Sequence, residues 1–472
     1  MFFKKAKPSP VPTLILGTQT VSNHALPFQV PFAQLTSGLI TGKSGFGKSI
    51  LLQQIFIQLF LHGTACSLFA PHADTATGIL AYLLSHGYFN RPDAFERLWY
   101  FKWSRRDYYP AFNFLSQPHY DPYTLASHTH EAFTRFFPSP DGTTPLFSSI
   151  FLPAVVTLIY NTLPLTALIP LITTPSLRTR LMSTVPDQAV RAMLQRLDTN
   201  SQLIQSTMRR LQLLLFHPIL RYSLGQKRNS INFRRIIDEE ISVIHDVSEL
   251  DYESQRLLLC LLQLGYESAG LSRSDVPAAD RRRHCLLVDE AAAVVGGSGE
   301  SFAVQFEQLR KFNILPVLTL QSFHRLPTPV QLALGNAGLE VAFRAPTEAD
   351  ARLLAHRLTE FSSAAAVKRR AADPPTRTEL QAETALLLER LPRQQARVRV
   401  GDRYATLTTL TMPPAAGNAR ALSALQDTYA RRLGTPAAQA EAEAEHLLQP
   451  LPRPQPEPQE QRSHEDDFFE PD

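Results

Sequence analysis

The sequence predicts an α/β protein with a mainly parallel central sheet, helices on both of its faces and an inserted all-α region. Three observations predict this. Short apolar runs typical of strands alternate with helical patterns over residues 13–110 and again over 234–412. Residues 111–233 carry helical patterns instead. A glycine-rich turn separates an early strand from an early helix. Alternating strands and helices imply a parallel sheet covered on both faces.

Composition is that of a packed globular protein. Of 472 residues, 44% are hydrophobic and 19% are charged. The net charge is only +4, from 47 basic and 43 acidic residues, so no overall field marks a polyanionic partner. Cys66, Cys260 and Cys285 are far apart and lack metal-ligand spacing, which fits a reducing cytoplasm. We therefore expect neither a disulfide framework nor a cysteine-based metal site.

The first half of the α/β region contains four predicted strands and two predicted helices. The strands are Thr13–Gly17, Leu39–Thr41 and Cys66–Ala70, with Trp99–Trp103 as a further one, and the helices are Ser49–His62 and Thr77–Ser85. The second half contains strands at Ile241–Val247, His284–Asp289, Ile314–Leu320, Leu339–Phe343, Gln395–Val400 and Ala405–Thr411, and helices at Glu253–Ala269 and Ser301–Phe312.

The inserted region shows helices such as Gln188–Leu197 and Leu203–Phe216. Its most hydrophobic stretch, Phe151–Thr173, contains three prolines and several polar residues. A membrane span needs about twenty consecutive apolar residues. We therefore expect a buried helical hairpin there and no transmembrane segment. The N-terminal residues lack a continuous apolar core, so no signal peptide is expected. These features predict a cytoplasmic protein, with any place at the inner membrane reached through partners.

The domain organisation follows from these shifts in pattern. We expect an N-terminal extension (1–12), a first part of the α/β domain (13–110), the all-α insertion (111–233) and a second part of the α/β domain (234–412). A C-terminal helical segment (413–448) includes an amphipathic helix at Ala419–Leu433, and a disordered, acidic, proline-rich tail (449–472) ends the sequence. The tail contains too little apolar material to build a core.

A phosphate-binding loop follows the strand Leu39–Thr41. The segment GKSGFGKS matches G-x-x-x-x-G-K-[ST] at every position, between a strand and a helix as the motif requires. Its glycines let successive backbone N–H groups face phosphates. Lys48 is expected to reach the β- and γ-phosphates of ATP, and the Ser49 hydroxyl to bind Mg²⁺. The expected nucleotide-binding residues are Gly42, Lys43, Ser44, Gly45, Phe46, Gly47, Lys48, Ser49 and Ile50.

The strand His284–Asp289 supplies the acidic residues that an ATPase needs. Its apolar run ends in Asp289 and then Glu290. Asp289 is expected to hold hydrated Mg²⁺, and Glu290 to polarise the attacking water as general base. Alone, such a strand is a weak signal. Together with the phosphate-binding loop it predicts a RecA-like P-loop NTPase of the ASCE type, with these two motifs as Walker A and Walker B.

A neighbouring strand, Ile314–Leu320, ends in Gln321. A polar side chain there can contact both the γ-phosphate and the lytic water, so Gln321 is a candidate sensor; the alternative is a glutamine that starts a loop. Phosphoryl transfer gains from an arginine supplied by another subunit. Arg310 and Arg344 are the candidates, and the sequence does not choose between them.

Other polar groups allow two interpretations each. His72 and Asp74 follow the strand Cys66–Ala70, at the edge where open α/β sheets bind ligands. They either contact a ligand or form a helix-capping turn. The basic clusters Arg281–Arg283 and Lys368–Arg370 are either solvated loops, which we favour, or contacts to DNA.

These motifs resemble those of the FtsK/HerA-type ATPases, and most of all the ATPases of type IV secretion and conjugation, such as TraG-like coupling proteins. The resemblance rests on GKSGFGKS, the turn Ala70–Asp74, LLVDEA, the pair Arg310–Lys311 and the strand end Leu320–Ser322, and it covers residues 13–412. Ala70 and Ala73 stand where that family commonly has Asp and Gly.

The resemblance implies a homo-oligomeric ring, expected to be a hexamer, that hydrolyses ATP and translocates DNA in conjugative transfer. A HerA-like helicase or translocase in DNA processing, a protein-secretion ATPase and a nucleotide-switched scaffold are the alternatives. DNA as a partner is implied by the resemblance alone. The C-terminal tail, which carries Phe468 and Phe469 among acidic residues, is a hypothetical docking peptide for a partner protein. A solubilising role for the tail is the alternative.

Overall fold

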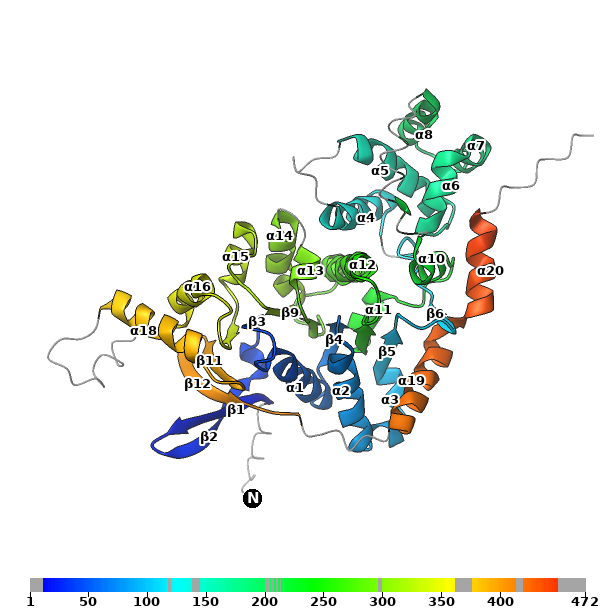
Figure 1. Cartoon of the computed structure of the whole chain (residues 1–472). Coiled ribbons are helices and arrows are strands. Elements are labelled where there is room, and N and C mark those ends of the chain that lie inside the picture. Colours follow the sequence, from blue (N-terminus) through cyan, green and yellow to red (C-terminus); the bar gives the residue numbers. More distant parts are fainter. Residues whose placement is uncertain are drawn as a thin grey trace, which may run out of the picture.

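The computed structural model describes residues 12–448 apart from 118–119, 138–144, 200–203, 205–207, 209–210, 213, 215, 296–298, 361–375 and 413–418. In this part of the chain, a central sheet lies between layers of helices, and further helices form a group beside it (Figure 1). The residues before 12, the basic cluster Lys368–Arg370 and the tail from 449 lie outside the described residues, as does much of the helix predicted over 203–216.

The central sheet has the order β2-β1-β12-β11-β10-β3-β9-β8-β4-β7-β5. Its strands are β1 (Thr13–Val21), β2 (His24–Pro31), β3 (Gly38–Thr41), β4 (Ala65–Ala70), β5 (Leu98–Lys102), β7 (Ser242–Asp246), β8 (His284–Val288), β9 (Ile314–Leu320), β10 (Leu339–Ala342), β11 (Gln395–Val400) and β12 (Arg403–Thr409). The strands from β10 to β5 pair in parallel. The strands β2, β1, β12 and β11 add an antiparallel extension. The predicted mainly parallel sheet is confirmed.

The parallel strands are apolar along their whole length because both faces of the sheet are covered. Every residue of β3, β4, β7, β8 and β9 is buried. Successive residues of β4 enter different cores: Leu68 packs with the cluster that contains α1, and Phe69 with the cluster that contains α12. Continuous apolar runs are what parallel strands between two helical layers require.

Helices cover the two faces of the sheet as Figure 1 shows, with α1 and α2 on one side and α12 and α14 on the other. The helices around the sheet are α1 (Lys48–Leu61), α2 (Ala73–Ser85), α3 (Ala94–Arg97), α11 (Phe233–Asp238), α12 (Tyr252–Leu271), α13 (Ala292–Val295), α14 (Glu300–Leu309), α15 (Thr328–Leu334), α16 (Glu348–Leu358) and α18 (Arg377–Arg390). The strands β8 and β9 therefore lie between helical layers. Because the parallel strands run in one direction, their carboxyl ends line up along one side of the sheet, here called the carboxyl edge, and their amino ends along the other, the amino edge.

A group of helices occupies the chain between residues 122 and 224. Its described members are α4 (Pro122–Phe136), α5 (Pro145–Tyr160), α6 (Leu168–Thr173), α7 (Pro175–Met182), α8 (Gln188–Gln195) and α10 (Pro218–Leu224). The hydrophobic stretch falls on α5 and α6, which pack against each other with Phe151, Leu158 and Leu171 buried. The predicted buried helical hairpin is confirmed. In the described residues, no helix is both long enough and apolar enough to cross a membrane.

The last described segment joins the sheet to this helical group. It consists of α19 (Ala419–Leu433), a short strand β13 (Gly434–Pro436) and α20 (Ala437–Leu448). The helix α19 packs against β5, the edge strand of the parallel block, and α20 packs against α10. Between them, β13 pairs with β6 (Tyr108–Pro110). One continuous segment therefore holds both parts of the molecule (Figure 1).

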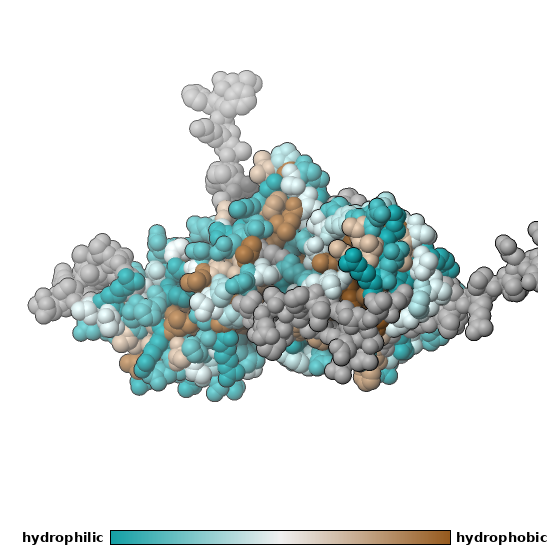
Figure 2. Space-filling model, turned by 90° about the horizontal axis from the view of Figure 1, so that it is seen from above, coloured by the Kyte–Doolittle hydropathy of each residue, from teal (hydrophilic) through white to brown (hydrophobic). Residues whose placement is uncertain are grey.

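The opposite edge of the sheet is β2, a strand that the sequence pattern does not predict. It contains Pro27 and Pro31, and most of its side chains are exposed. Proline is tolerated on an edge strand where the backbone N–H that it lacks would face solvent and would make no hydrogen bond within the sheet. On the face of the molecule in Figure 2, hydrophobic residues form small, separate groups among hydrophilic ones.

Candidate functional site

The phosphate-binding loop spans the carboxyl end of β3 and the start of α1. Gly42 and Gly47 have φ angles of 139° and 121°, which side chains with a Cβ rarely adopt. A Cβ on Gly42 would also lie 2.7 Å from the Cβ of Phe343. No side chain caps the start of α1 at Gly47. The backbone N–H groups of this turn are thus positioned to bind an anion at the positive end of the helix.

Three neighbouring segments hold the loop in place. The Gly42 amide donates to the carbonyl of Leu320 at 3.1 Å, at the end of β9. The Lys43 amide donates to the carbonyl of Arg344 at 2.7 Å. The carbonyl of Phe46 accepts from the amide of Gln394 at 3.0 Å, just before β11. These main-chain bonds tie the loop to the ends of β9 and β10 and to the residue before β11.

Lys48 is buried at the first turn of α1, with 5% of its surface exposed. Its ammonium donates to the carbonyl of Lys43 at 3.4 Å, across the loop. Burial lowers the pKa of Lys48 below its ordinary value, and the charges of Glu290 and Asp289 oppose that shift. A desolvated cation between a phosphate loop and two carboxylates is available to bind a polyanion strongly.

Asp289 follows β8 directly and is completely buried. Its Oδ1 atom accepts from the Thr319 hydroxyl at 2.6 Å and from the Ser49 hydroxyl at 3.4 Å. Its Oδ2 atom accepts from the Thr75 hydroxyl at 3.0 Å, on α2. Hydroxyl groups from three segments, α1, α2 and β9, therefore surround the carboxylate at the end of β8.

This donor set fits a magnesium ion held jointly with a nucleotide. Ser49 and Asp289 offer one hydroxyl and one carboxylate, 3.4 Å apart. Mg²⁺ binds in proteins through one or two such groups, several waters and substrate phosphates. In the described residues, no group of three His, Cys, Asp or Glu side chains is arranged to hold a metal ion without a nucleotide.

Glu290 is held in an unusual backbone conformation, with φ at 54°. Such a conformation is uncommon for a residue other than glycine and is found in turns as well as at functional sites. The Glu290 amide donates to the Thr319 hydroxyl at 2.9 Å, and the Gln321 side chain donates to the Glu290 carboxylate at 3.0 Å. The candidate base and the candidate sensor are thus in direct contact, next to Asp289.

The turn that carries Gln321 is organised by a buried carboxylate that the sequence pattern does not single out. Asp350, on α16, accepts from the Ser322 hydroxyl and, at 2.8 Å each, from the amides of Phe323 and His324. It is completely buried. These bonds fix the chain just after β9, so Asp350 positions Gln321 without touching it.

The two candidate arginines lie in different places. Arg344 follows β10 at the carboxyl edge, and its guanidinium lies over the ring of Phe46 in the phosphate-binding loop, 5.7 Å from the ring centre. Arg310 lies between α14 and β9, where β9 begins, and therefore at the amino edge of the sheet. The structure brings Arg344 to its own chain's loop and leaves Arg310 on the far edge.

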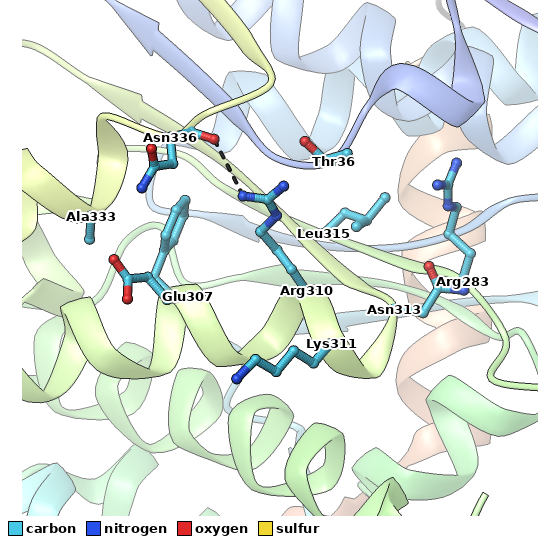
Figure 3. Close-up of a pocket in the computed structure, with 10 residues that line it drawn as sticks. Thr36, Arg283, Glu307, Arg310, Lys311, Asn313, Leu315, Ala333 and Asn336 are labelled. Carbon is cyan, nitrogen blue, oxygen red and sulfur yellow. Dashed lines mark hydrogen bonds between the residues drawn. The ribbon is translucent and has the colours of Figure 1, made fainter. Parts of the chain in front are cut away.

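Arg310 lines a pocket of about 760 Å³ at that far edge. The pocket walls carry three cations, one carboxylate and two carboxamides, from Arg283, Arg310, Lys311, Glu307, Asn313 and Asn336. Arg310 points toward Asn336, whose carbonyl accepts from it at 3.4 Å, and Lys311 points away (Figure 3). With the described carboxylates, Arg283, Arg310 and Lys311 form no ion pair. The pocket is basic and open to a negatively charged group from outside.

The remaining candidates have structural contacts. His72 is the N-cap residue of α2, with no hydrogen bond from its side chain to the helix, and Asp74 lies in the first turn. In the basic cluster, Arg281 donates to the carbonyls of Val276 and Lys311, and Arg283 to that of Phe32. These contacts account for the positions of both arginines within the fold.

Solved structures share this fold. The bacterial conjugative coupling protein TrwB, in an unbound form that lacks its N-terminal segment, matches with a TM-score of 0.52 and 18% identity, over 84% of this chain and 91% of that one. TrwB in complex with the GTP analogue GDPNP matches with a TM-score of 0.52 and 16% identity, over 86% of this chain and 98% of that one. VirB4 of Thermoanaerobacter pseudethanolicus matches with a TM-score of 0.52 and 12% identity, over 85% of this chain and 97% of that one.

Sequence comparisons give no such match: no protein-family model matches the chain, and no curated protein does. At the identities seen with TrwB and VirB4, the likeness concerns the fold. It confirms that this chain shares the mixed α/β fold of TrwB and VirB4, with a large, mainly parallel central sheet.

Proposed function

We propose that this protein is an ATP-hydrolysing motor that forms a ring and translocates DNA, in conjugative transfer or a related type IV secretion process. The observation that carries the enzymatic part is the contact between Glu290 and Gln321 beside the buried Asp289. A nucleotide-switched scaffold has no need of a carboxylate held in a strained conformation next to the phosphate-binding loop. The DNA part is supported by the likeness in fold to TrwB, a conjugative coupling protein.

Each residue has a distinct role in this proposal. The loop from Gly42 to Ser49, with Ile50 after it, binds the triphosphate, and Lys48 neutralises charge on its β- and γ-phosphates. Glu290 orients a water molecule and accepts its proton, and Gln321 holds that carboxylate in position. Ser49 and Asp289 would hold Mg²⁺, which would supply positive charge next to the phosphate groups.

Arg310 is the arginine that we assign to catalysis in a neighbouring subunit. It lies at the amino edge of the sheet, away from its own phosphate-binding loop, in a basic pocket without an ion-pair partner among the described carboxylates. Arg344 lies over Phe46 and therefore contributes to the site of its own chain. A head-to-tail ring that joins one subunit's amino edge to the next subunit's carboxyl edge completes each site.

The test is steady-state ATP hydrolysis by the purified chain, with and without single- and double-stranded DNA. We expect DNA to stimulate hydrolysis, and Lys48→Ala and Glu290→Gln to abolish it. Hydrolysis that is indifferent to DNA would contradict the DNA part of the proposal and favour a protein substrate. Tight nucleotide binding without hydrolysis in every condition would contradict the motor itself.

A further inference from the structure

One helix holds the segment of chain that runs from Gln321 to the surface around Arg310. We refer to residues 321–324, which follow β9, as the sensor turn; α15 comes next and ends at Leu334. Asp350 and Arg357 lie about two turns apart on the same face of α16. Asp350 accepts hydrogen bonds from the sensor turn. Arg357, at the other end of α16, also contacts this segment.

The guanidinium of Arg357 bridges the start and the end of the segment. It lies over the ring of Phe323, in the sensor turn, at 5.0 Å from the ring centre. Its Nη2 atom donates to the carbonyl of Leu334 at 2.7 Å. One side chain therefore joins the turn that carries the candidate sensor to the end of the following helix.

A buried carboxylate fixes this guanidinium to the sheet. Glu340, on β10, is 2% exposed and accepts from the Nε atom of Arg357 at 2.8 Å. It also accepts from Arg399, on β11. Removal of one partner from a buried ion pair is unfavourable, because the other charge is left uncompensated. Arg357 is thus a fixed point against which the sensor turn and the end of α15 are both held.

The end of α15 also holds Arg310. Two residues after Leu334, the carbonyl of Asn336 accepts from Arg310 at 3.4 Å. The Leu334 carbonyl, which accepts from Arg357, accepts from the amide of Ala337 at 3.1 Å as well, so these residues form one tight turn. The turn that Arg357 holds is therefore the turn that bonds to Arg310.

We propose that Arg357 is a positioning residue that links the sensor turn of one ATPase site to Arg310, which acts in the site of the neighbouring subunit. This inference rests on the proposed function, because it takes Gln321 as the sensor and Arg310 as the arginine supplied in trans. It adds a path by which nucleotide at one site affects hydrolysis at the next. Packed side chains and ion pairs between rigid elements carry coupling of this kind.

Mixed rings test the proposal. A chain with Arg310→Ala keeps its own phosphate-binding loop but needs an arginine from a donor chain. One donor is Lys48→Ala, which lacks the lysine for the β- and γ-phosphates; the other is Glu290→Gln, which is expected to bind ATP without hydrolysing it. We expect the hydrolysis recovered with the two donors to differ several-fold, because only the second donor holds a triphosphate against its Gln321.

Arg357→Met in either donor should remove that difference. It should also lower the recovered kcat by about 10²-fold, the cost that a misplacement of about 1 Å can have, with the KM for ATP unchanged because the acceptor chain binds the nucleotide. Arg352→Met is the matched control, since Arg352 is an exposed arginine of α16 that pairs with Glu348 of the same helix. Unchanged ring assembly, measured by light scattering, shows that each donor is folded.

A second variant leaves the buried ion pair in place. Phe323→Leu keeps an apolar side chain in the sensor turn but removes the ring under the Arg357 guanidinium. In the donor chain it too should remove the difference between Lys48→Ala and Glu290→Gln.

The outcomes separate this inference from the proposed function. Equal recovery with the two donors, or a difference that survives both Arg357→Met and Phe323→Leu, would overturn the link and leave the proposed function intact. No recovery with any donor would contradict the assignment of Arg310 to a neighbouring site, and this inference with it.

Discussion

The two edges of the parallel sheet differ in how their polar groups are satisfied. At the carboxyl edge, the Thr319 hydroxyl donates to the Asp289 carboxylate and accepts from the Glu290 amide, and Gln321 donates to the Glu290 carboxylate. At the amino edge, Arg310 donates to the main-chain carbonyl of Asn336 and forms no ion pair with the described carboxylates. Charged groups placed near low-dielectric walls without a counter-ion favour binding of an opposite charge from outside. In the proposed function, the carboxyl edge binds the nucleotide and the amino edge meets a neighbouring subunit.

The largest effect should come from Arg310→Ala, which tests whether the amino edge serves a neighbour. An arginine supplied in trans is worth about 10³–10⁵ in kcat, so we expect hydrolysis to fall by at least about 10³-fold while nucleotide binding persists. Mixing this variant with Lys48→Ala should partly restore hydrolysis, because mixed rings contain interfaces with an intact loop and an intact Arg310. Lys311→Ala, which removes the adjacent cation, is the control.

No recovery on mixing would contradict the assignment of Arg310 to a neighbouring site. It would then leave Arg344, which lies over Phe46 at the carboxyl edge, as the remaining candidate. The same measurement on Arg344→Ala distinguishes the two, since a residue that acts in its own chain is not rescued by mixing.

Glu290→Gln should produce the next largest effect, and it separates binding from chemistry at the carboxyl edge. The amide keeps the size of the side chain but cannot accept a proton. Hydrolysis should fall by about 10²–10⁴-fold, the usual contribution of a general base, with ATP affinity unchanged. Steady-state assays measure the rate of hydrolysis, and equilibrium binding of a fluorescent ATP analogue measures the affinity. Glu307→Gln, in the pocket at the amino edge, is the matched control. An equal loss of hydrolysis in that variant would contradict a special role for the carboxylate at the carboxyl edge.

Asp350→Ala should act on stability as well as on activity. It removes the acceptor of the Ser322 hydroxyl and of two amides, and each buried donor left unpaired costs about 1–3 kcal/mol. We expect the free energy of unfolding to fall by about 3 kcal/mol in urea denaturation, and hydrolysis to fall because Gln321 loses its support. The exposed Asp402→Ala should change stability by less than about 0.5 kcal/mol. Wild-type hydrolysis in Asp350→Ala would show that the turn does not position Gln321.

The smallest effect concerns Lys48 in the nucleotide-free chain. Because burial lowers its pKa in the folded state, the unfolded chain binds protons more readily, and the charge on Lys48 disfavours folding at neutral pH. We expect Lys48→Met to raise the free energy of unfolding by about 1 kcal/mol at pH 7. The gain should shrink as the pH rises through the lowered pKa toward 10.5. A loss of stability in this variant would mean that the charges of Glu290 and Asp289 outweigh the cost of burying the Lys48 ammonium.

Much of the fold could be predicted because its elements carry clear local patterns. Ile314–Leu320 is a continuous apolar run between two helical layers, Gln395–Val400 alternates buried and partly exposed residues, and Ala419–Leu433 is an amphipathic helix. All three have the same bounds in the sequence prediction and in the structure. The strand β2 could not be predicted, since its two prolines indicate a loop and its exposed side chains lack a pattern. The strands β6 and β13 are three residues each, too short for any periodicity.

The site shows the same division between local and distant signals. The phosphate-binding loop, Asp289, Glu290 and Gln321 carry local motifs, and the structure brings them together. Thr75 and Thr319 could not be found, because a hydroxyl beside a carboxylate is set by the pairing of distant segments. Asp350 does carry a local sequence signal, because Thr347 three residues before it is the pattern of a helix N-cap. In the structure the Thr347 hydroxyl accepts from the Asp350 amide at the start of α16. That pattern marks a helix start but not the contact with Ser322.

The edge strand β2 has a consequence for how molecules of this protein meet. An open sheet edge offers a row of backbone groups on which a foreign strand can add, and this is a common route to aggregation. Pro27 and Pro31 interrupt that row, because each lacks an N–H group. At the other end of the sheet, α19 covers β5. Fibre-like growth through the sheet is therefore disfavoured in both directions, and side-chain surfaces are left as the favoured means of assembly.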